Sequence, residues 1–297
     1  MQKHTRHLPA LAKEAIEFLG PKPNQNFIDC TIGDGGHAEV ILDKTAPRGK
    51  LVGFDRDEQA LNRARKFLSK FGERIQLIND NFANLDKYVD TASKPDGILF
   101  DFGFSSAEIQ DPERGFSFHA SGPLDMRFDR RQELTAAHIV NMYVEKDLVR
   151  IFRQYGEERY ALKIARQIVQ TRKKSPIAMT QELVRVIGQA VPASYLRSRI
   201  HFATRVFQAL RVETNAELEA IEAALPKALA ALKPGGTIVA ISFHSLEDRI
   251  VKHLFKDWAK QDLVKILTKK PIRPSEPEIE NNPRARSAKL RAIQKQK

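Results

Sequence analysis

The sequence predicts an α/β protein with a mostly parallel sheet covered by helices on both faces and interrupted by an inserted helical subdomain. Three observations lead to this prediction. Short apolar runs alternate with amphipathic helical segments up to residue 102. A crowded glycine turn joins the first run to the helix behind it, and the alternation resumes near residue 237 after a long stretch without strands. Such alternation is typical of right-handed βαβ units, which build doubly covered parallel sheets.

Each predicted strand is a short apolar run bounded by polar residues. The strands are predicted at residues 27–30, 51–55, 75–78, 96–102 and 237–243. Helices with one apolar face are predicted at residues 8–20, 38–45, 57–71, 215–232 and 246–259. In the helix over 215–232, Pro226 predicts a kink or a split, and Thr214 with Glu217 predicts a capping box at its start.

The middle of the chain has a different pattern. Residues 105–132 show neither helical nor strand period, but Phe116, Phe118 and Phe128 favour an ordered loop over a site rather than disorder. Helical periodicity without strands then runs from 135 to 212. We therefore expect a discontinuous α/β domain, residues 1–105 and 213–297. The residues between, 106–212, are expected to form an inserted loop and helical domain that recognises the substrate.

Amino-acid composition indicates the kind of partner and the cellular compartment. The chain of 297 residues carries 49 Lys and Arg against 37 Asp and Glu, a formal charge of +12, which favours a polyanionic partner. A single cysteine, Cys30, excludes a disulfide framework and indicates a reducing compartment. No apolar run is long enough to span a bilayer, and the N-terminus lacks an apolar signal segment. The expectation is a soluble, cytoplasmic protein without a membrane partner.

The basic C-terminal tail leaves two readings open. Six Lys and Arg residues fall within the last 14 residues without an acidic residue among them. They fit either a solvated tail or an arm that contacts phosphates. Leu290 and Ile293 leave room for a short edge strand there.

The glycine turn indicates a nucleotide-like ligand. Gly33, Gly35 and Ala38 fit the G-x-G-x-x-G/A pattern, and Asp55, 20 residues after Gly35, suits a carboxylate on ribose hydroxyls. Asp29 lies just before the glycines, where a pyrophosphate would be unfavourable and a cationic ligand such as S-adenosylmethionine would be favoured. A nicotinamide dehydrogenase and a purely structural turn remain alternatives.

The later strand ends add acceptors at the same sheet edge. Asp101, Ser105 and Ser106 follow the fourth strand, and His244 follows the fifth. Acceptors that grip the N–H groups of an aromatic amine would localise its lone pair and help to remove a proton. A lone histidine in such a place is more often a structural hydrogen-bonding residue than a base, and this is the alternative for His244. Phe82 would either stack on an adenine or, as the residues alone favour, pack in the core. No Cys/His spacing typical of a metal site occurs, so no metal is expected.

Several unusual sequence motifs resemble those of one known protein family. They are DCTIGDGGHA, DFGFSS, DPERGFSF, GPLDMR, YGEER, ATRVFQALR, SFHSLEDR and NPRARSAKLR, in this order over nearly the whole chain. The chain resembles the bacterial small-subunit ribosomal RNA methyltransferase H family. That resemblance implies a class I methyltransferase fold with an inserted helical domain, and S-adenosylmethionine as the cofactor. It also implies N4-methylation of a cytidine in the decoding region of 16S rRNA within the small ribosomal subunit.

The resemblance also implies site residues. The implied cofactor contacts are Gly35, Gly36, His37, Asp55, Phe82, Asp101 and, where the family usually has Gln, Glu108. With the strand-end reasoning above, Asp101, Ser105 and His244 are the expected catalytic residues. Asp34, Phe202 and Gln110 depart from the family pattern. A non-catalytic RNA-binding assembly factor remains an alternative function. The sequence also leaves open whether the protein forms a homodimer.

The expected substrate surface is a basic wall on the insertion that would hold folded RNA. Its members are Arg172, Lys173, Lys174, Arg197, Arg199, His201 and Arg205.

Overall fold

The structure is a computed structural model that describes residues 9–89 and 94–297. The chain divides into two compact units. The first comprises Met1–Gly103 with Leu218–Lys297, and the second comprises Phe104–Glu217. The first unit is therefore discontinuous in sequence.

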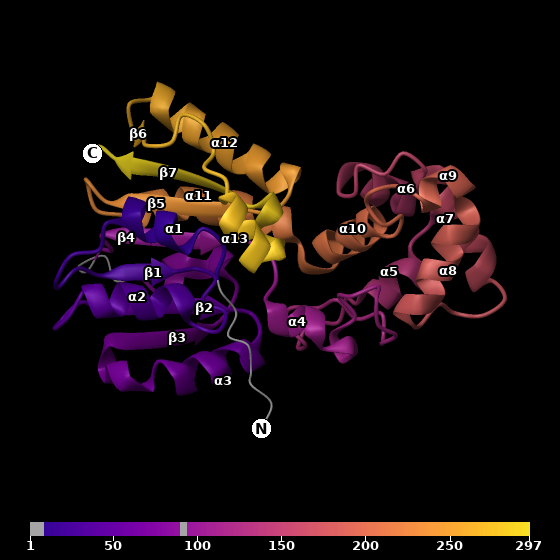
Figure 1. Ribbon diagram of the computed structural model, residues 1–297, viewed down its shortest axis with the longest axis horizontal. Helices are drawn as coiled ribbons and strands as arrows, with labels where there is room; N and C mark the ends of the chain where they lie inside the picture. Colours follow the sequence, from indigo (N-terminus) through magenta and orange to yellow (C-terminus); the bar gives the residue numbers. More distant parts are fainter. Residues whose placement is uncertain (1–8, 90–93) are drawn as a thin grey trace. The chain divides into compact units, whose positions relative to one another are not determined.

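A seven-stranded sheet forms the centre of the first unit, in the order β3-β2-β1-β4-β5-β7-β6 (Figure 1). The strands are β1 (Phe27–Asp29), β2 (Leu51–Asp55), β3 (Ile75–Asn79), β4 (Gly97–Asp101), β5 (Thr237–Ser242), β6 (Val264–Ile266) and β7 (Lys289–Lys295). The pairs among β1 to β5 are all parallel, whereas β7 runs antiparallel to both β5 and β6. The prediction of a mostly parallel sheet is confirmed.

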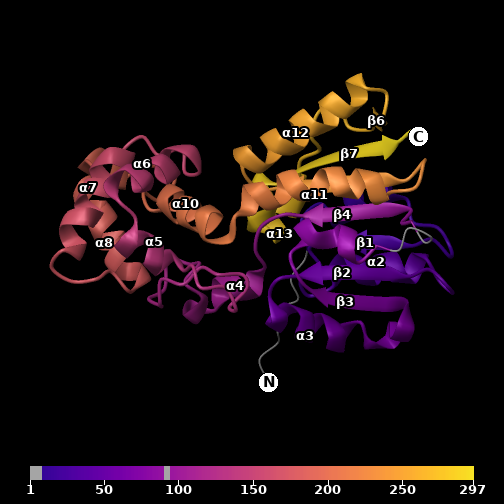
Figure 2. The ribbon, with the colours of Figure 1, turned by 180° about the vertical axis from the view of Figure 1, so that it is seen from behind.

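Helices cover both faces of this sheet, as the view from behind also shows (Figure 2). One apolar cluster joins the sheet to α1 (Ala12–Leu19), α2 (Gly36–Lys44) and α3 (Glu58–Phe67). A second cluster joins its other face to α11 (Glu217–Ala231) and α12 (Ser245–Lys260). Neighbouring strand residues such as Phe27 and Ile28 belong to different clusters, because successive side chains of a strand point to opposite faces. The remaining short helices of the first unit are η1 (Ser69–Arg74), η2 (Phe82–Lys87), α13 (Glu276–Asn281) and η4 (Pro283–Ser287).

The C-terminal tail corrects one expectation. The predicted edge strand at Leu290 and Ile293 is instead β7, which lies inside the sheet between β5 and β6. Arg291 and Lys289 do not form part of a free arm, because both pair with Asp248 of α12, at 2.7 Å and 3.4 Å. The strand β6 was not predicted, since three residues with a central lysine carry little strand pattern.

The helix before β5 differs from two further sequence-based expectations. It is one continuous element, α11, so the predicted split at Pro226 is wrong. Pro226 is exposed, while Ile221, Leu225 and Leu232 on the opposite stripe are buried and hold the helix against the sheet. The predicted capping box also fails, because Thr214 still belongs to the preceding helix α10.

The second unit is helical. Its elements are α4 (Ser106–Gln110), η3 (Pro112–Arg114), α5 (Ala136–Met142), α6 (Glu145–Gln154), α7 (Ala161–Arg172), α8 (Thr180–Ala190), α9 (Ala193–Leu196) and α10 (Thr204–Asn215). One apolar core joins α5 to α10 with the loop after η3. Phe116 stacks between Phe104 and Phe128 at centroid distances of 5.9 Å and 5.4 Å, which explains why this aperiodic loop is ordered. Within the described ranges, none of the helices combines the length and apolar character that crossing a membrane requires.

Candidate functional site

The glycine turn links β1 to α2 in a conformation that suits glycine. Gly33 and Gly35 have φ of +50° and +90°, in the left-handed region that side chains disfavour. A Cβ on Gly36 would lie 2.8 Å from Cγ of Pro9, so the start of α2 also needs a residue without a side chain. The turn therefore brings backbone N–H groups and the N-terminus of α2 to the carboxyl edge of the sheet.

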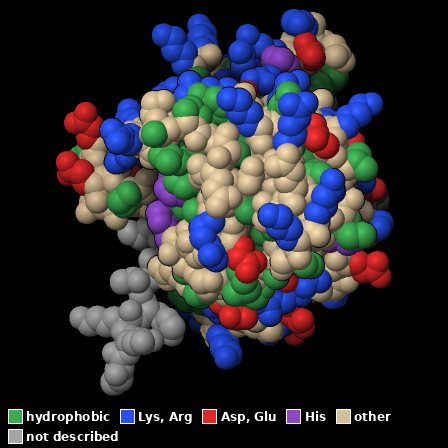
Figure 3. Space-filling model, turned by 90° about the vertical axis from the view of Figure 1, so that its right-hand side faces the viewer, with side chains coloured by type: hydrophobic (Ala, Val, Ile, Leu, Met, Phe, Trp, Pro, Cys, Tyr) green, Lys and Arg blue, Asp and Glu red, His purple; other side chains and the backbone are tan. Residues whose placement is uncertain are grey.

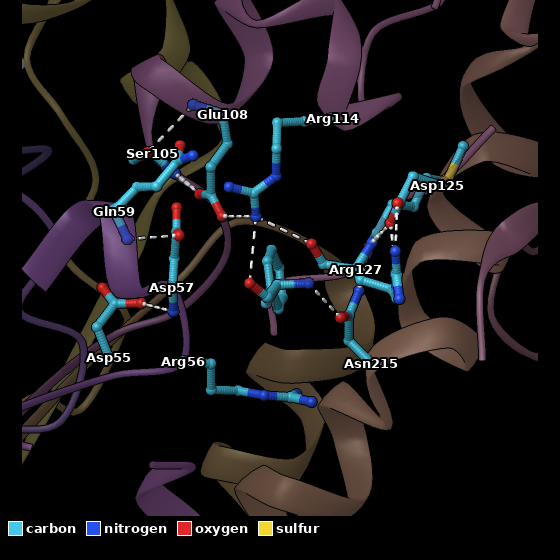
Figure 4. A network of polar contacts seen from close by, with 12 residues as sticks. Asp55, Arg56, Asp57, Gln59, Ser105, Glu108, Arg114, Asp125, Arg127 and Asn215 are labelled. Atoms are coloured by element: carbon cyan, nitrogen blue, oxygen red, sulfur yellow. Dashed lines mark hydrogen bonds and ion pairs between the residues drawn. The ribbon is translucent and has the colours of Figure 1, made fainter. Parts of the chain in front are cut away.

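Asp55 holds this turn from the end of β2. Its Oδ2 accepts a hydrogen bond from the backbone N–H of Gly33 at 3.0 Å. Its Oδ1 accepts one from the backbone N–H of Asp57 at 2.8 Å (Figure 4). Burial raises the pKa of Asp55 to about 6, although these two donors favour the charged form. A carboxylate has further lone pairs, so these two bonds leave Asp55 able to accept from ribose hydroxyls, and its cofactor role stays a prediction.

Asp29, His37 and Asp101 come together at the ends of β1 and β4. Asp29 is 1 % exposed and His37 is 5 % exposed. His37 Nε2 lies 3.5 Å from Oδ2 of Asp101. Thr31 ties the two strands together, because its hydroxyl accepts from the backbone N–H of Asp101 at 2.7 Å and its own N–H donates to Oδ1 of Asp29 at 3.1 Å.

Burial raises the pKa of Asp29 to about 6. At His37 burial alone would lower the pKa, but the Asp101 and Asp29 carboxylates outweigh it and raise the pKa above its ordinary value. Four polar atoms of this group are buried without a hydrogen-bond partner among the described residues: Asp29 Oδ2, both ring nitrogens of His37 and Asp101 Oδ1. Buried polar groups normally have partners, so this arrangement fits a polar ligand. The negative charge of two carboxylates suits the ammonium and sulfonium groups of S-adenosylmethionine.

Phe82, the first residue of η2, is half-buried. Its ring packs edge-on against Phe100 at 5.7 Å and tilted against Phe102 at 6.1 Å. Packing against the core and contact with an adenine are thus compatible, and the cofactor role of Phe82 stays a prediction.

Ser105 and Glu108 form a capping box at the start of α4, in the second unit. Ser105 Oγ accepts from the N–H of Glu108 at 3.3 Å, and Glu108 Oε2 accepts from the N–H of Ser105 at 2.7 Å. Oε1 of Glu108 lies 3.5 Å from the buried guanidinium of Arg114 (Figure 4). These contacts give both residues a structural role; their predicted catalytic and cofactor roles stay predictions. The side chain of Ser106 lies outside the described part of the structure.

His244 caps α12 in the first unit. Its Nδ1 accepts from the N–H of Glu247 at 3.4 Å, and its Nε2 lies 3.1 Å from Oε1 of Glu247. This is the structural hydrogen-bonding role that was the alternative for this residue, and the predicted catalytic role is untested.

Sequence reasoning overlooked two residues that shape the site. Arg63 of α3 pairs with Asp34 at 2.7 Å, so the acidic residue that departs from the family pattern is balanced within the turn. Arg114, within the string DPERGFSF, is the second: it is buried and donates to two carbonyls of the loop after η3. Burial of an arginine could not be foreseen there, because the segment lacks a periodic pattern.

The raised pKa values of Asp29 and Asp55 predict that acid stabilises the ligand-free protein but weakens cofactor binding. Without ligand, a group whose folded pKa exceeds its unfolded value stabilises the protein below the unfolded pKa, and that stability is lost as pH rises through about 6. Acidification from pH 7.5 to 5.5 should therefore add stability through these groups and His37. We expect the charged Asp29 to attract the cationic groups of S-adenosylmethionine, so the Kd for the cofactor should rise up to about tenfold per pH unit below 6.

Isothermal titration with S-adenosylmethionine and thermal unfolding across this range check both signs. The Asp29→Asn variant is the matched control: it should bind weakly and lose part of the pH dependence. A Kd that stays constant from pH 7.5 to 5.5 would contradict the role of Asp29.

A profile of the MraW methylase family matches residues 4–296. The chain is 47 % identical to the ribosomal RNA small subunit methyltransferase H of Syntrophotalea carbinolica, over 98 % of each chain. It is 49 % identical to the protein of the same name from Carboxydothermus hydrogenoformans, over 97 % of each.

A solved structure shows the same fold. It is a protein from Clostridium thermocellum described provisionally as an rRNA methylase, with a TM-score of 0.50 and 14 % identity over 98 % of both chains. At that identity the likeness concerns the fold alone. The sequence match extends over almost every residue, and on that ground the chain belongs to the MraW methylase family.

Proposed function

We propose that this methyltransferase transfers the methyl group of S-adenosylmethionine to N4 of a cytidine in the decoding region of 16S rRNA, within the small ribosomal subunit and in the cytoplasm. The observation that carries the proposal is the buried group Asp29, His37 and Asp101, whose unpartnered polar atoms lie at the carboxyl edge of the sheet in a chain of this family. The relatives' name, a ribosomal RNA small subunit methyltransferase, supports the substrate.

Six residues of the first unit would hold the cofactor: Gly35, Gly36, His37, Asp55, Phe82 and Asp101. The glycines let its polar end approach the backbone, and Asp55 would accept from ribose hydroxyls. Phe82 would contact the adenine. Glu108 is a seventh candidate, and its existing partners, Ser105 and Arg114, favour an indirect contribution. When bound, the cofactor supplies an electrophilic methyl group on a sulfonium sulfur.

The protein's own task is to position a poor nucleophile. The N4 lone pair of cytosine is delocalised into the ring, so the amine needs acceptors for its N–H groups. Asp101 Oδ1, which has no partner among the described residues, would accept one of them. Ser105, four residues later in the chain, would supply a second acceptor. The remaining contribution is orientation for an in-line displacement.

The second unit would carry the RNA. Residues 144–205 contain 13 Lys and Arg against 5 Asp and Glu. Figure 3 shows blue side chains spread over this side of the molecule with fewer red ones. Arg172 and Arg205 of the predicted basic wall donate to backbone carbonyls and so have structural roles. Lys173, Lys174, Arg197 and Arg199 are exposed and remain the proposed phosphate contacts.

The decisive experiment incubates the protein with unmodified small subunits and S-adenosylmethionine labelled on its methyl group. Digestion to nucleosides should place the label in N4-methylcytidine from 16S rRNA. Label in a different nucleoside would refute the proposed target atom, and absence of label would refute the substrate. NADH, the donor for the alternative dehydrogenase, should not bind in a parallel titration.

A further inference from the structure

Four aromatic rings of the second unit contact one another in a group that bends at Phe118, where His119 also lies 6.0 Å from His201. We call this group the ring ladder: Phe202, His201, Phe118 and His119. His201 stacks on Phe202 with centroids 4.3 Å apart and on Phe118 at 4.5 Å, nearly parallel at 9°. Phe118 in turn meets His119 at 4.5 Å. The ladder joins the loop after η3 to the segment before α10, and His119 at its end is exposed.

The inner rungs are fixed in place. Phe118 packs edge-on against the buried Phe207 at 5.5 Å, and its carbonyl accepts from Gln181 of α8 at 2.6 Å. Nδ1 of His201 accepts from the backbone N–H of Ala203 at 3.2 Å, so that nitrogen carries no proton and Nε2 holds it. Burial, with a smaller contribution from His119, lowers the pKa of His201, which keeps the ring neutral and suited to stacking.

A basic segment continues directly from the ladder. Arg197 and Arg199 precede His201 in the chain, and both are exposed. Within residues 9–89 and 94–297, neither guanidinium has a carboxylate at ion-pair distance. Ser198 Oγ donates to the carbonyl of Ile200 at 2.5 Å, which folds the segment locally, and Ile200 is 54 % exposed. Arginines without a carboxylate partner, in a segment that leads into the ladder, and an exposed aromatic ring are the two elements that single-stranded nucleic acid requires.

We propose that the ring ladder with Arg197 and Arg199 binds an unpaired RNA strand, in addition to the base that is methylated. A base stacks on the exposed ring of His119, and the neighbouring phosphates bind the two guanidinium groups. Only an unpaired base offers a free face for stacking, because the faces of a paired base are covered by its neighbours. This inference rests on the proposed function in that the partner is RNA, and it adds which conformation of RNA the second unit binds.

The test measures binding, so its outcome does not depend on methyl transfer. The probe is a fluorescently labelled, unstructured RNA of about 12 nucleotides, compared with a duplex of equal length by anisotropy. Arg197→Ala with Arg199→Ala should weaken single-strand binding and reduce the slope of log K against log salt by about 1.4, since each phosphate contributes about 0.7. His119→Ala should weaken it at least about fivefold.

His119→Phe keeps a stacking face and should bind like the wild type. The charge-matched control is Lys252→Ala with Lys256→Ala on α12, which should leave single-strand binding nearly unchanged. Equal losses in His119→Ala and His119→Phe, or an unaltered salt slope in the double arginine variant, would overturn the proposal. It would also fail if the variants lost duplex binding as strongly as single-strand binding. If these results hold but small subunits are not methylated, the proposed function fails while the RNA site stands.

Discussion

Asp101→Ala should lower the rate of methyl transfer to small subunits at least about 100-fold. The substitution removes a carboxylate at the end of β4 whose Oδ1 has no partner among the described residues and whose Oδ2 lies 3.5 Å from His37. Breaking a buried charged contact typically costs about 2–5 kcal/mol, which exceeds the 2.7 kcal/mol of a 100-fold change over most of that range. Initial rates with labelled S-adenosylmethionine measure the effect.

Asp101→Asn separates charge from shape. The amide keeps one acceptor oxygen and the side-chain volume, so its rate should lie between those of the wild type and the alanine variant. The pKa of His37 gives a second test that does not depend on activity. Without the Asp101 carboxylate, burial dominates, so a proton NMR titration should place the pKa of His37 below 6.5. Methylation at the wild-type rate by Asp101→Ala would remove Asp101 from the catalytic assignment.

Arg114→Met should destabilise the second unit by about 3–5 kcal/mol, because it leaves the buried carboxylate of Glu108 without its cation. The guanidinium also donates to the carbonyls of Arg127 and Phe128, at 2.9 Å and 3.2 Å, which hold the loop after η3 (Figure 4). Arg114 is 2 % exposed, so water cannot replace these contacts. Urea unfolding monitored by circular dichroism measures the loss.

The matched control for this variant lies in the same loop. Arg131→Met removes the same group from an ion pair with Asp129, but the Arg131 side chain is 62 % exposed. Surface pairs of this kind contribute about 0–1 kcal/mol. Similar losses in both variants would show that burial of Arg114 is not what stabilises the loop.

Local patterns were sufficient to predict the parallel half of the fold. The apolar runs that end in Asp29, Asp55 and Asp101 are β1, β2 and β4. The family match confirms the predicted methyltransferase, its class I fold and S-adenosylmethionine as the cofactor. These features depend on short stretches of sequence whose periodicity carries the information.

Features that depend on contacts between distant segments could not be predicted. Three of the seven residues of β7 are basic, and its place inside the sheet follows only from its pairing with β5 and β6. Glu217 was assigned to a helix cap, yet it forms a bidentate pair with Arg211 at 2.8 Å and 2.9 Å. The unpartnered atoms of His37 and Asp101 are likewise a property of the folded chain, because they result from neighbouring strands placed side by side.

The discontinuity of the first unit has a consequence for biosynthesis. During translation β4 emerges 135 residues before β5, the strand that pairs with its free edge. At about 5–20 residues per second, that edge waits roughly 7–27 s with unpaired N–H and C=O groups, which are a template for unwanted pairing between chains. The whole helical second unit, Phe104–Glu217, leaves the ribosome before β5 does. A ribosome-bound chain should therefore pass through a stage in which the inserted unit is folded and the sheet around it is still open.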